Sequence, residues 1–154
     1  MPNYRRDKTP GATFFFTVAA AQRGGKILTD NIHLLRCAYL RTWQEQPFRC
    51  DAMVVLPDHI HAVWTLPEGD CDYSTRWRKL KSRFTRSLGQ TMGRSLSKVM
   101  KNERGIWQRR FWEHRIRDAD DYCHHLEYCR VNPVKHGLVE AAEDWPFSSF
   151  NRNP

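Results

Sequence analysis

The stretch VVLPDHIHAVW, residues 54–64, decides how the rest of the chain is interpreted. The Pro57-Asp58 pair favours a tight turn and separates two apolar segments, a pattern that predicts two strands joined as a hairpin. Successive side chains of a strand alternate between its two faces, so His59 and His61 are expected to point the same way. Two neutral imidazoles side by side on one face of a sheet can supply two ligands of a metal site.

Strand-like and helix-like segments alternate along the rest of the chain. Apolar spacing, turn residues and candidate caps predict strands at 13–20, 48–56 and 59–66, one bent strand or two short ones within 107–116, and helices at 29–45, 74–88 and 118–132. The last helix is expected to end before Pro133, because the residue before a proline disfavours helical geometry. An aromatic tail at 145–150 is expected to pack on the sheet. This order suggests an α+β sandwich, an antiparallel sheet with helices packed mainly on one face.

The chain has 154 residues, which fits one domain with a proper core. Residues 1–11 are expected to form a polar arm and residues 89–105 a basic loop. No apolar run approaches the length that spans a membrane. The five cysteines form no Cys-x-x-Cys pair, which favours reduced thiols and a cytoplasmic location over a disulfide framework.

The formal net charge of +8 is concentrated in one part of the chain. Residues 74–117 hold 14 of the 25 Lys and Arg residues but only two acids, Glu103 and Glu113. Aromatic residues that could stack on bases are interleaved with these charges: Trp77, Phe84, Trp107, Phe111 and Trp112. The pattern predicts a face that binds a polyanion. A basic surface that only keeps the chain soluble is the alternative.

The helix at 74–88 is expected to be amphipathic. Its inward residues, at helical spacing, are Trp77, Leu80, Phe84 and Leu88. Its outer, basic face is expected to carry Arg76, Arg78, Lys79, Arg83 and Arg86. Together with Arg109 and Arg110, these side chains are the candidates for contacts with a nucleic-acid backbone.

The chemistry open to the His59–His61 pair is that of a divalent ion. Two imidazole nitrogens leave room in the coordination sphere for an amide oxygen, water and a phosphate oxygen, which suits Mg²⁺ or Mn²⁺ in phosphoryl transfer. Zinc also binds imidazole and has the higher raw affinity, although no cysteine lies at a zinc-site spacing.

Tyr128 and Asn132 lie four residues apart on the helix expected at 118–132, and so share a face. A phenol that attacks phosphorus must lose a proton, which a polar pocket and a nearby cation favour. The amide oxygen of Asn132 could be a third metal ligand, which would bring nucleophile and metal to one phosphate. The alternative is that Tyr128 belongs to the core and Asn132 only ends the helix.

Five blocks in chain order resemble the REP-associated tyrosine transposases, a branch of the HUH single-strand DNA endonucleases. They are residues 4–17, 55–64 with the His-Ile-His strand, 107–114, 128–139 with the Tyr-x-x-x-Asn-Pro segment, and 145–149. The loop at 89–105 departs from the family in being longer and more basic than expected.

The resemblance implies a ferredoxin-like fold, with His59 and His61 as metal ligands, Tyr128 as nucleophile and Asn132 as third ligand. It implies a substrate of imperfect-palindrome (REP-type) DNA, folded as a hairpin with a single-stranded tetranucleotide at its foot. The arm around Tyr4, Arg5 and Arg6 would help to read that foot. It also favours a monomer, while related insertion-sequence transposases are dimers.

The sequence therefore predicts a metal-dependent enzyme that cleaves and rejoins single-stranded or hairpin DNA through a 5′-phosphotyrosine. Two alternatives remain. A catalytically silent hairpin-binding protein would bind DNA without forming a covalent adduct. A zinc-dependent hydrolase using His59 and His61 would activate water, but no Glu lies beside the pair to act as general base.

Overall fold

The computed structural model describes residues 5–92 and 105–151. Its elements are β1 (Thr13–Ala19), α1 (Ile27–Asp30), α2 (Ile32–Glu45), β2 (Arg49–Val55), β3 (His59–Thr65), α3 (Tyr73–Met92), β4 (Trp112–Arg115), α5 (Ala119–Lys135), and the 3₁₀ segments η1 (Ala142–Asp144) and η2 (Ser149–Asn151). The strands form one antiparallel sheet in the order β2-β3-β1-β4. The predicted hairpin is confirmed, because β2 and β3 pair directly across Pro57-Asp58. Tyr4 and residues 93–104 of the expected basic loop lie outside the described residues.

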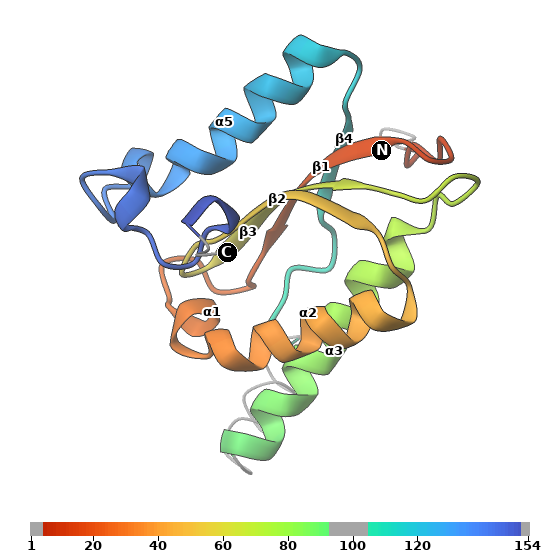
Figure 1. Cartoon of the computed structure of the whole chain (residues 1–154). Helices are drawn as coiled ribbons and strands as arrows, with labels where there is room; N and C mark the ends of the chain where they lie inside the picture. The colour runs from red at the N-terminus through yellow and green to blue at the C-terminus, as the bar shows by residue number, and fades with distance from the viewer. Residues whose placement is uncertain (1–4, 93–104, 152–154) are drawn as a thin grey trace.

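Helices cover both faces of this sheet: α1, α2 and α3 lie on one side and α5 on the other (Figure 1). On the side of α2 and α3, Phe14 and Phe16 of β1 join Trp64 of β3 in the larger apolar cluster. Trp64 stacks on Trp77 of α3 with ring centroids 4.1 Å apart. On the opposite side, Phe15 belongs to a smaller cluster that includes residues of α5. The α+β fold with an antiparallel sheet is confirmed.

The apolar face predicted for α3 is confirmed, since Trp77, Leu80, Phe84 and Leu88 are all fully buried. The prediction that Arg76 lies on the outer face is wrong, because this residue is only 1% exposed. Its guanidinium pairs with Asp70 and donates hydrogen bonds to the carbonyl oxygens of residues 46 and 47. Arg76 therefore fastens α3 to the end of α2, and is not available to DNA.

Two predicted helix ends are also wrong. α3 continues to Met92, so the expected loop does not begin at residue 89. α5 continues through Pro133 to Lys135. The proline falls in the last turn, where its missing N–H removes a single helical hydrogen bond, and the His136 amide still donates to the Asn132 carbonyl. The helix predicted at 29–45 is divided into α1 and α2, with Asn31 between them.

The aromatic tail packs on the sheet as predicted. Trp145 Nε1 donates to the carbonyl of Val55, and the Val55 amide donates to the carbonyl of Phe147. Ser148 forms an isolated bridge with Val54, which extends the edge of β2. Within residues 5–92 and 105–151, no helix has the length and apolar character needed to cross a membrane.

Candidate active site on the α5 face

His59 and His61 point to the α5 face of the sheet, as the alternation of the strand requires. Their ring centroids lie 4.8 Å apart, and the two residues are 5% and 4% exposed. β3 is hydrogen-bonded to β2 on one side and β1 on the other, so both rings stand on a fixed backbone. The common orientation predicted from the His-x-His spacing is confirmed.

Each imidazole is held through its Nδ1 atom. Thr17 lies opposite His61 in the register, and its hydroxyl is 2.9 Å from His61 Nδ1. The carboxylate of Asp58 is 2.7 Å from His59 Nδ1. A partner on one ring nitrogen fixes the orientation of the other, so Nε2 of each ring is the candidate metal donor.

Both histidines are held in the neutral form that binds metals. Burial lowers the pKa of His61 to about 3, with further contributions from His59, His136 and Lys135. Burial also lowers the pKa of His59, and the neighbouring Asp58 carboxylate only partly opposes that shift. A neutral imidazole keeps a lone pair for a cation and has no proton to release on binding.

A stripe of α5 residues faces the histidine pair. The Tyr128 ring lies 5.1 Å from that of His61, and the His136 ring lies 5.3 Å from that of His59. Asn132 is four residues from each, so it lies between them along the same face of the helix. Lys135 brings its ammonium group to 5.2 Å from the centre of the Tyr128 ring.

Asn132 is the residue that most needs a further partner. It is fully buried, and neither its Oδ1 nor its Nδ2 has a hydrogen-bond partner among the residues that the structure describes. An amide left in this state costs about 1–3 kcal/mol. An amide oxygen beside two neutral imidazoles fits the donor set of a divalent ion that also binds phosphate oxygens.

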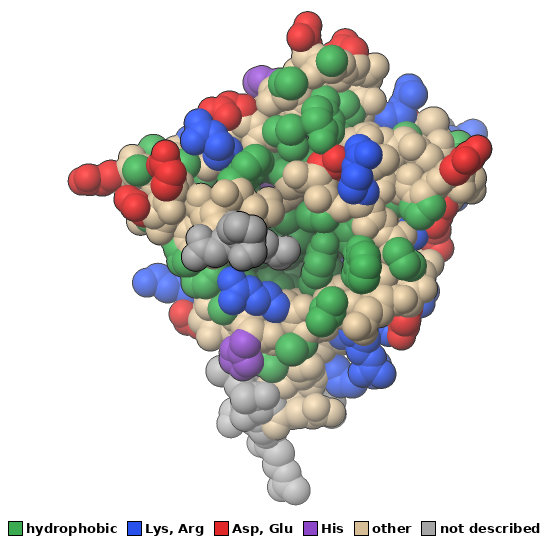
Figure 2. All heavy atoms as spheres, in the orientation of Figure 1, with side chains coloured by type: hydrophobic (Ala, Val, Ile, Leu, Met, Phe, Trp, Pro, Cys, Tyr) green, Lys and Arg blue, Asp and Glu red, His purple; other side chains and the backbone are tan. Residues whose placement is uncertain are grey.

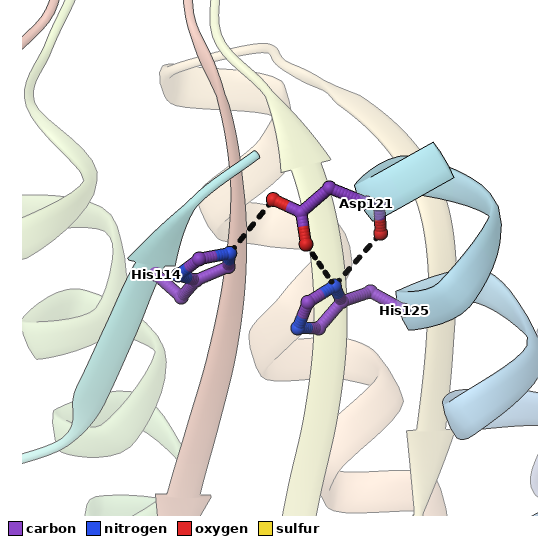
Figure 3. A group of neighbouring side chains, drawn as sticks. All are labelled: His114, Asp121 and His125. Carbon is purple, nitrogen blue, oxygen red and sulfur yellow. Dashed lines mark hydrogen bonds and ion pairs between the residues drawn. The ribbon is translucent and has the colours of Figure 1, made fainter. Parts of the chain in front are cut away.

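A second polar cluster lies at the other end of α5 (Figure 3). His114, Asp121 and His125 bring their potential ligand atoms within 4.8 Å of one another, an arrangement compatible with a divalent metal site. Neither His114 nor His125 is among the site residues predicted from the sequence.

The predicted DNA-binding side chains are not all free. Arg78, Arg86, Arg109 and Arg110 are exposed, as is Arg5. Others are paired: Lys79 and Arg83 with Glu45, and Arg6 with Glu113. α3 covers the opposite side of the sheet from α5, so its basic residues do not adjoin Tyr128 (Figure 1). On the face drawn in Figure 2, basic and acidic side chains are interspersed rather than gathered in one patch.

Three site residues were missed from the sequence. His136 and Lys135 were placed beyond the helix, because Pro133 was expected to end it. Continued helical spacing from Tyr128 would have found His136 eight residues on. Thr17 is identified only by the pairing of β1 with β3, which the sequence does not state.

No family model matches the chain, but it is similar to known proteins along nearly its whole length. A REP-associated tyrosine transposase of Escherichia coli K12 is 47% identical over 153 residues, 99% of this chain and 85% of that protein. A Haemophilus influenzae relative is 49% identical over 154 residues, 99% of this chain and 88% of its own length.

Two solved structures resemble the fold. A REP-associated tyrosine transposase bound to a REP hairpin superposes with a TM-score of 0.87 at 46% identity, covering 99% of this chain and 84% of that one. A protein from Deinococcus radiodurans has a TM-score of 0.54 at 11% identity over 90% of this chain and 98% of its own, which shows a shared fold alone.

Proposed function

This chain belongs to the REP-associated tyrosine transposases, and we propose that it cleaves and rejoins single-stranded or hairpin DNA through a covalent link to Tyr128. One observation carries the proposal. The Tyr128 ring packs edge-on against the His61 ring, with centroids 5.1 Å apart. One turn along α5 lies the buried Asn132, whose side chain has no hydrogen-bond partner among the described residues. This arrangement supports Tyr128 as the nucleophile and His59, His61 and Asn132 as ligands of a metal that acts on the same phosphate.

In the proposed reaction, Tyr128 Oη forms a bond to the scissile phosphorus, and the bond from phosphorus to the 3′-oxygen breaks. The phenol loses a proton and the departing 3′-hydroxyl gains one, so the step leaves a 5′-phosphotyrosine. The Lys135 ammonium places a positive charge beside the attacking phenolate. Because the new linkage is itself a phosphodiester, attack by a 3′-hydroxyl reverses the step and rejoins the strand.

His59 and His61, with Asn132 as third donor, would hold Mg²⁺ or Mn²⁺. When bound, such an ion polarises the phosphate oxygens and orients the scissile bond. Thr17 and Asp58 orient the two rings, while burial keeps them neutral. The two histidines are positioned by β3, a central strand, and Asn132 would be supplied by α5.

The proposed substrate is a REP-type hairpin with a single-stranded foot, by likeness to the relative that was solved with a REP hairpin. The exposed arginines Arg5, Arg78, Arg86, Arg109 and Arg110 are the side chains proposed to contact the phosphate backbone. We further propose that the chain acts as a monomer in the cytoplasm.

The test is a covalent-adduct assay with a labelled REP-type hairpin oligonucleotide and Mn²⁺ on a denaturing gel. Tyr128→Phe should abolish the slow-migrating protein–DNA band and retain hairpin binding on a native gel. Tyr122→Phe is the matched control, because Tyr122 lies on the same helix with its hydroxyl bound to Asp51 at 2.7 Å. That variant should still form the adduct.

The two alternatives give other outcomes. Hairpin retardation without a covalent band in any protein, under several metals, would indicate a silent DNA-binding module. Cleavage that survives Tyr128→Phe but is lost in His61→Ala would indicate a hydrolase that uses water.

A further inference from the structure

His114, Asp121 and His125 form a second potential ligand set, outside the Tyr128 site and on two different elements (Figure 3). His114 stands on β4, at the edge of the sheet, and the other two on the first turns of α5. We infer that this cluster binds a transition-metal ion of the zinc class, which fastens β4 to the N-terminal end of α5. The inference concerns metal binding and stability, so it does not depend on the proposed function.

The three side chains already lie close together, with their potential ligand atoms within 4.8 Å of one another. His114 Nε2 lies 2.8 Å from Asp121 Oδ2, and His125 Nδ1 lies 3.1 Å from Asp121 Oδ1. Ligands of a tetrahedral zinc ion, at ~2.1 Å from the metal, are roughly 3.4 Å apart. The side chains would therefore rotate to receive an ion. The ion would replace the hydrogen bonds that now join the groups, including the one that His125 Nδ1 donates to the Asp121 carbonyl at 2.8 Å.

The carboxylate of the cluster is ionised at neutral pH. An ordinary aspartate, with a pKa near ~4, is charged at that pH, and the Asp121 carboxylate accepts a hydrogen bond from the Arg117 amide at 3.0 Å. A metal would meet a ready negative charge between two imidazoles. Asp118 caps α5 by accepting from the Asp121 amide, which fixes the backbone that carries this carboxylate.

Aromatic neighbours hold the two imidazoles in place. Trp112 stacks on His114 with ring planes 5° apart, and Phe15 lies 4.7 Å from His125. The side chains of the three ligands are still 23%, 9% and 14% exposed, in chain order, so an ion can enter from solvent. A fixed, partly open ligand set of this kind binds metal with little reorganisation.

The donor types select the metal. Two imidazoles and one carboxylate favour Zn²⁺ and Co²⁺, whereas Mg²⁺ prefers oxygen ligands and retains its water. The Arg117 guanidinium opposes a cation, because its Nε lies 3.6 Å from Asp121 Oδ2. Its side chain is 71% exposed, so it can move into solvent when an ion binds.

The experiment counts metal ions on the chelator-treated full chain. The background variant is His59→Ala/His61→Ala, which removes the first ligand set. We expect one equivalent of Zn²⁺ in calorimetry, and a Co²⁺ visible spectrum without the thiolate charge-transfer bands that cysteine ligands give. Adding His114→Ala/His125→Ala should abolish both. Adding His33→Ala, which removes an exposed histidine of α2, should change neither.

Two further measurements distinguish a metal site from three side chains that are joined only by hydrogen bonds. Zn²⁺ should raise the unfolding midpoint of the background variant, and not that of the same protein with His114→Ala/His125→Ala. Arg117→Gln should tighten Zn²⁺ binding severalfold by removing the opposing charge. Zinc stoichiometry that is zero in the background variant, or unchanged by His114→Ala/His125→Ala, would overturn the inference. A failure of the proposed function would appear instead as the absence of any covalent adduct, or as cleavage that survives Tyr128→Phe, and would leave this stoichiometry unchanged.

Discussion

The two faces of the sheet are made by the same strands from opposite kinds of side chain. On the α2–α3 face, β3 presents Ile60, Ala62 and Trp64, all fully buried in the main apolar cluster. The alternate positions of the same strand, His59 and His61, face α5. The alternation of the strand therefore gives the two faces different roles. The α2–α3 face supplies most of the buried apolar surface, and the α5 face carries buried polar groups that need hydrogen-bond partners or a metal ion.

The largest expected effect is on the α2–α3 face. Trp77→Ala should lower the free energy of unfolding by about 3–5 kcal/mol, because the indole is fully buried and stacked on Trp64. Trp43→Ala is the control. Trp43 is 40% exposed and donates one hydrogen bond, so its loss should cost about 1 kcal/mol. Equal losses in denaturant unfolding would show that this face does not dominate stability.

The buried histidine His61 on the α5 face should make the protein less stable at acidic pH. The pKa of His61 is about 3 in the folded chain and about 6.5 in an unfolded one, so below pH 6.5 the unfolded state binds a proton that the folded state does not. Stability should therefore fall as the pH drops. With a chelator present, the wild type should lose about 3 kcal/mol more between pH 7 and pH 4 than His61→Gln. Parallel losses in the two proteins would contradict the burial of a neutral His61.

Asn132→Leu should stabilise the metal-free protein by about 1–2 kcal/mol. It replaces a buried amide, which has no hydrogen-bond partner within residues 5–92 and 105–151, by an apolar side chain of similar size. The same change should weaken Mn²⁺ binding and slow adduct formation. Denaturant unfolding and calorimetry test the two effects separately. A loss of stability without any effect on metal binding would mean that Asn132 serves the core.

The smallest effect concerns the basic residues of α3. Arg78 is exposed, whereas Arg83 is paired with Glu45 on α2. If Arg78 contacts a phosphate, Arg78→Gln should reduce the salt dependence of hairpin binding by about 0.7–0.9 in log–log slope. Arg83→Gln should leave the slope nearly unchanged and lower stability slightly. Equal slopes for the two variants would remove Arg78 from the DNA interface.

Much of the difference between the two faces of the sheet could be predicted from the sequence, because it depends on the regular spacing of side chains along strands and helices. The spacing of His59 and His61 gave the face on which they lie, and the four-residue interval gave Tyr128 and Asn132 a common side. Helical spacing likewise identified the apolar face of α3. It misplaced Arg76, because a residue type that is usually exposed was assumed to be exposed here.

The remaining errors concern tertiary contacts and a helix end, which the spacing of residues along the sequence does not predict. Pro133 was expected to end α5, but a proline in the last turn removes only one hydrogen bond, and the helix reaches His136 as its C-cap. His114 meets Asp121 and His125 only because the chain bends between β4 and α5. Thr17 faces His61 only through the register of two strands far apart in the sequence.

The position of β3 in the sheet also predicts which amide protons are best protected from hydrogen exchange. β3 is hydrogen-bonded along both sides, while β4 pairs with β1 alone over four residues. The amide protons of β3 should therefore be among the slowest to exchange with deuterium, and those of β4 among the faster. α5 is held to the sheet by side-chain contacts, among them the Tyr122–Asp51 hydrogen bond and the buried Cys129. An opening that separated α5 from β3 would therefore break none of the hydrogen bonds that join β3 to β1 and β2. Such an opening would move Tyr128 and leave His59 and His61 in place.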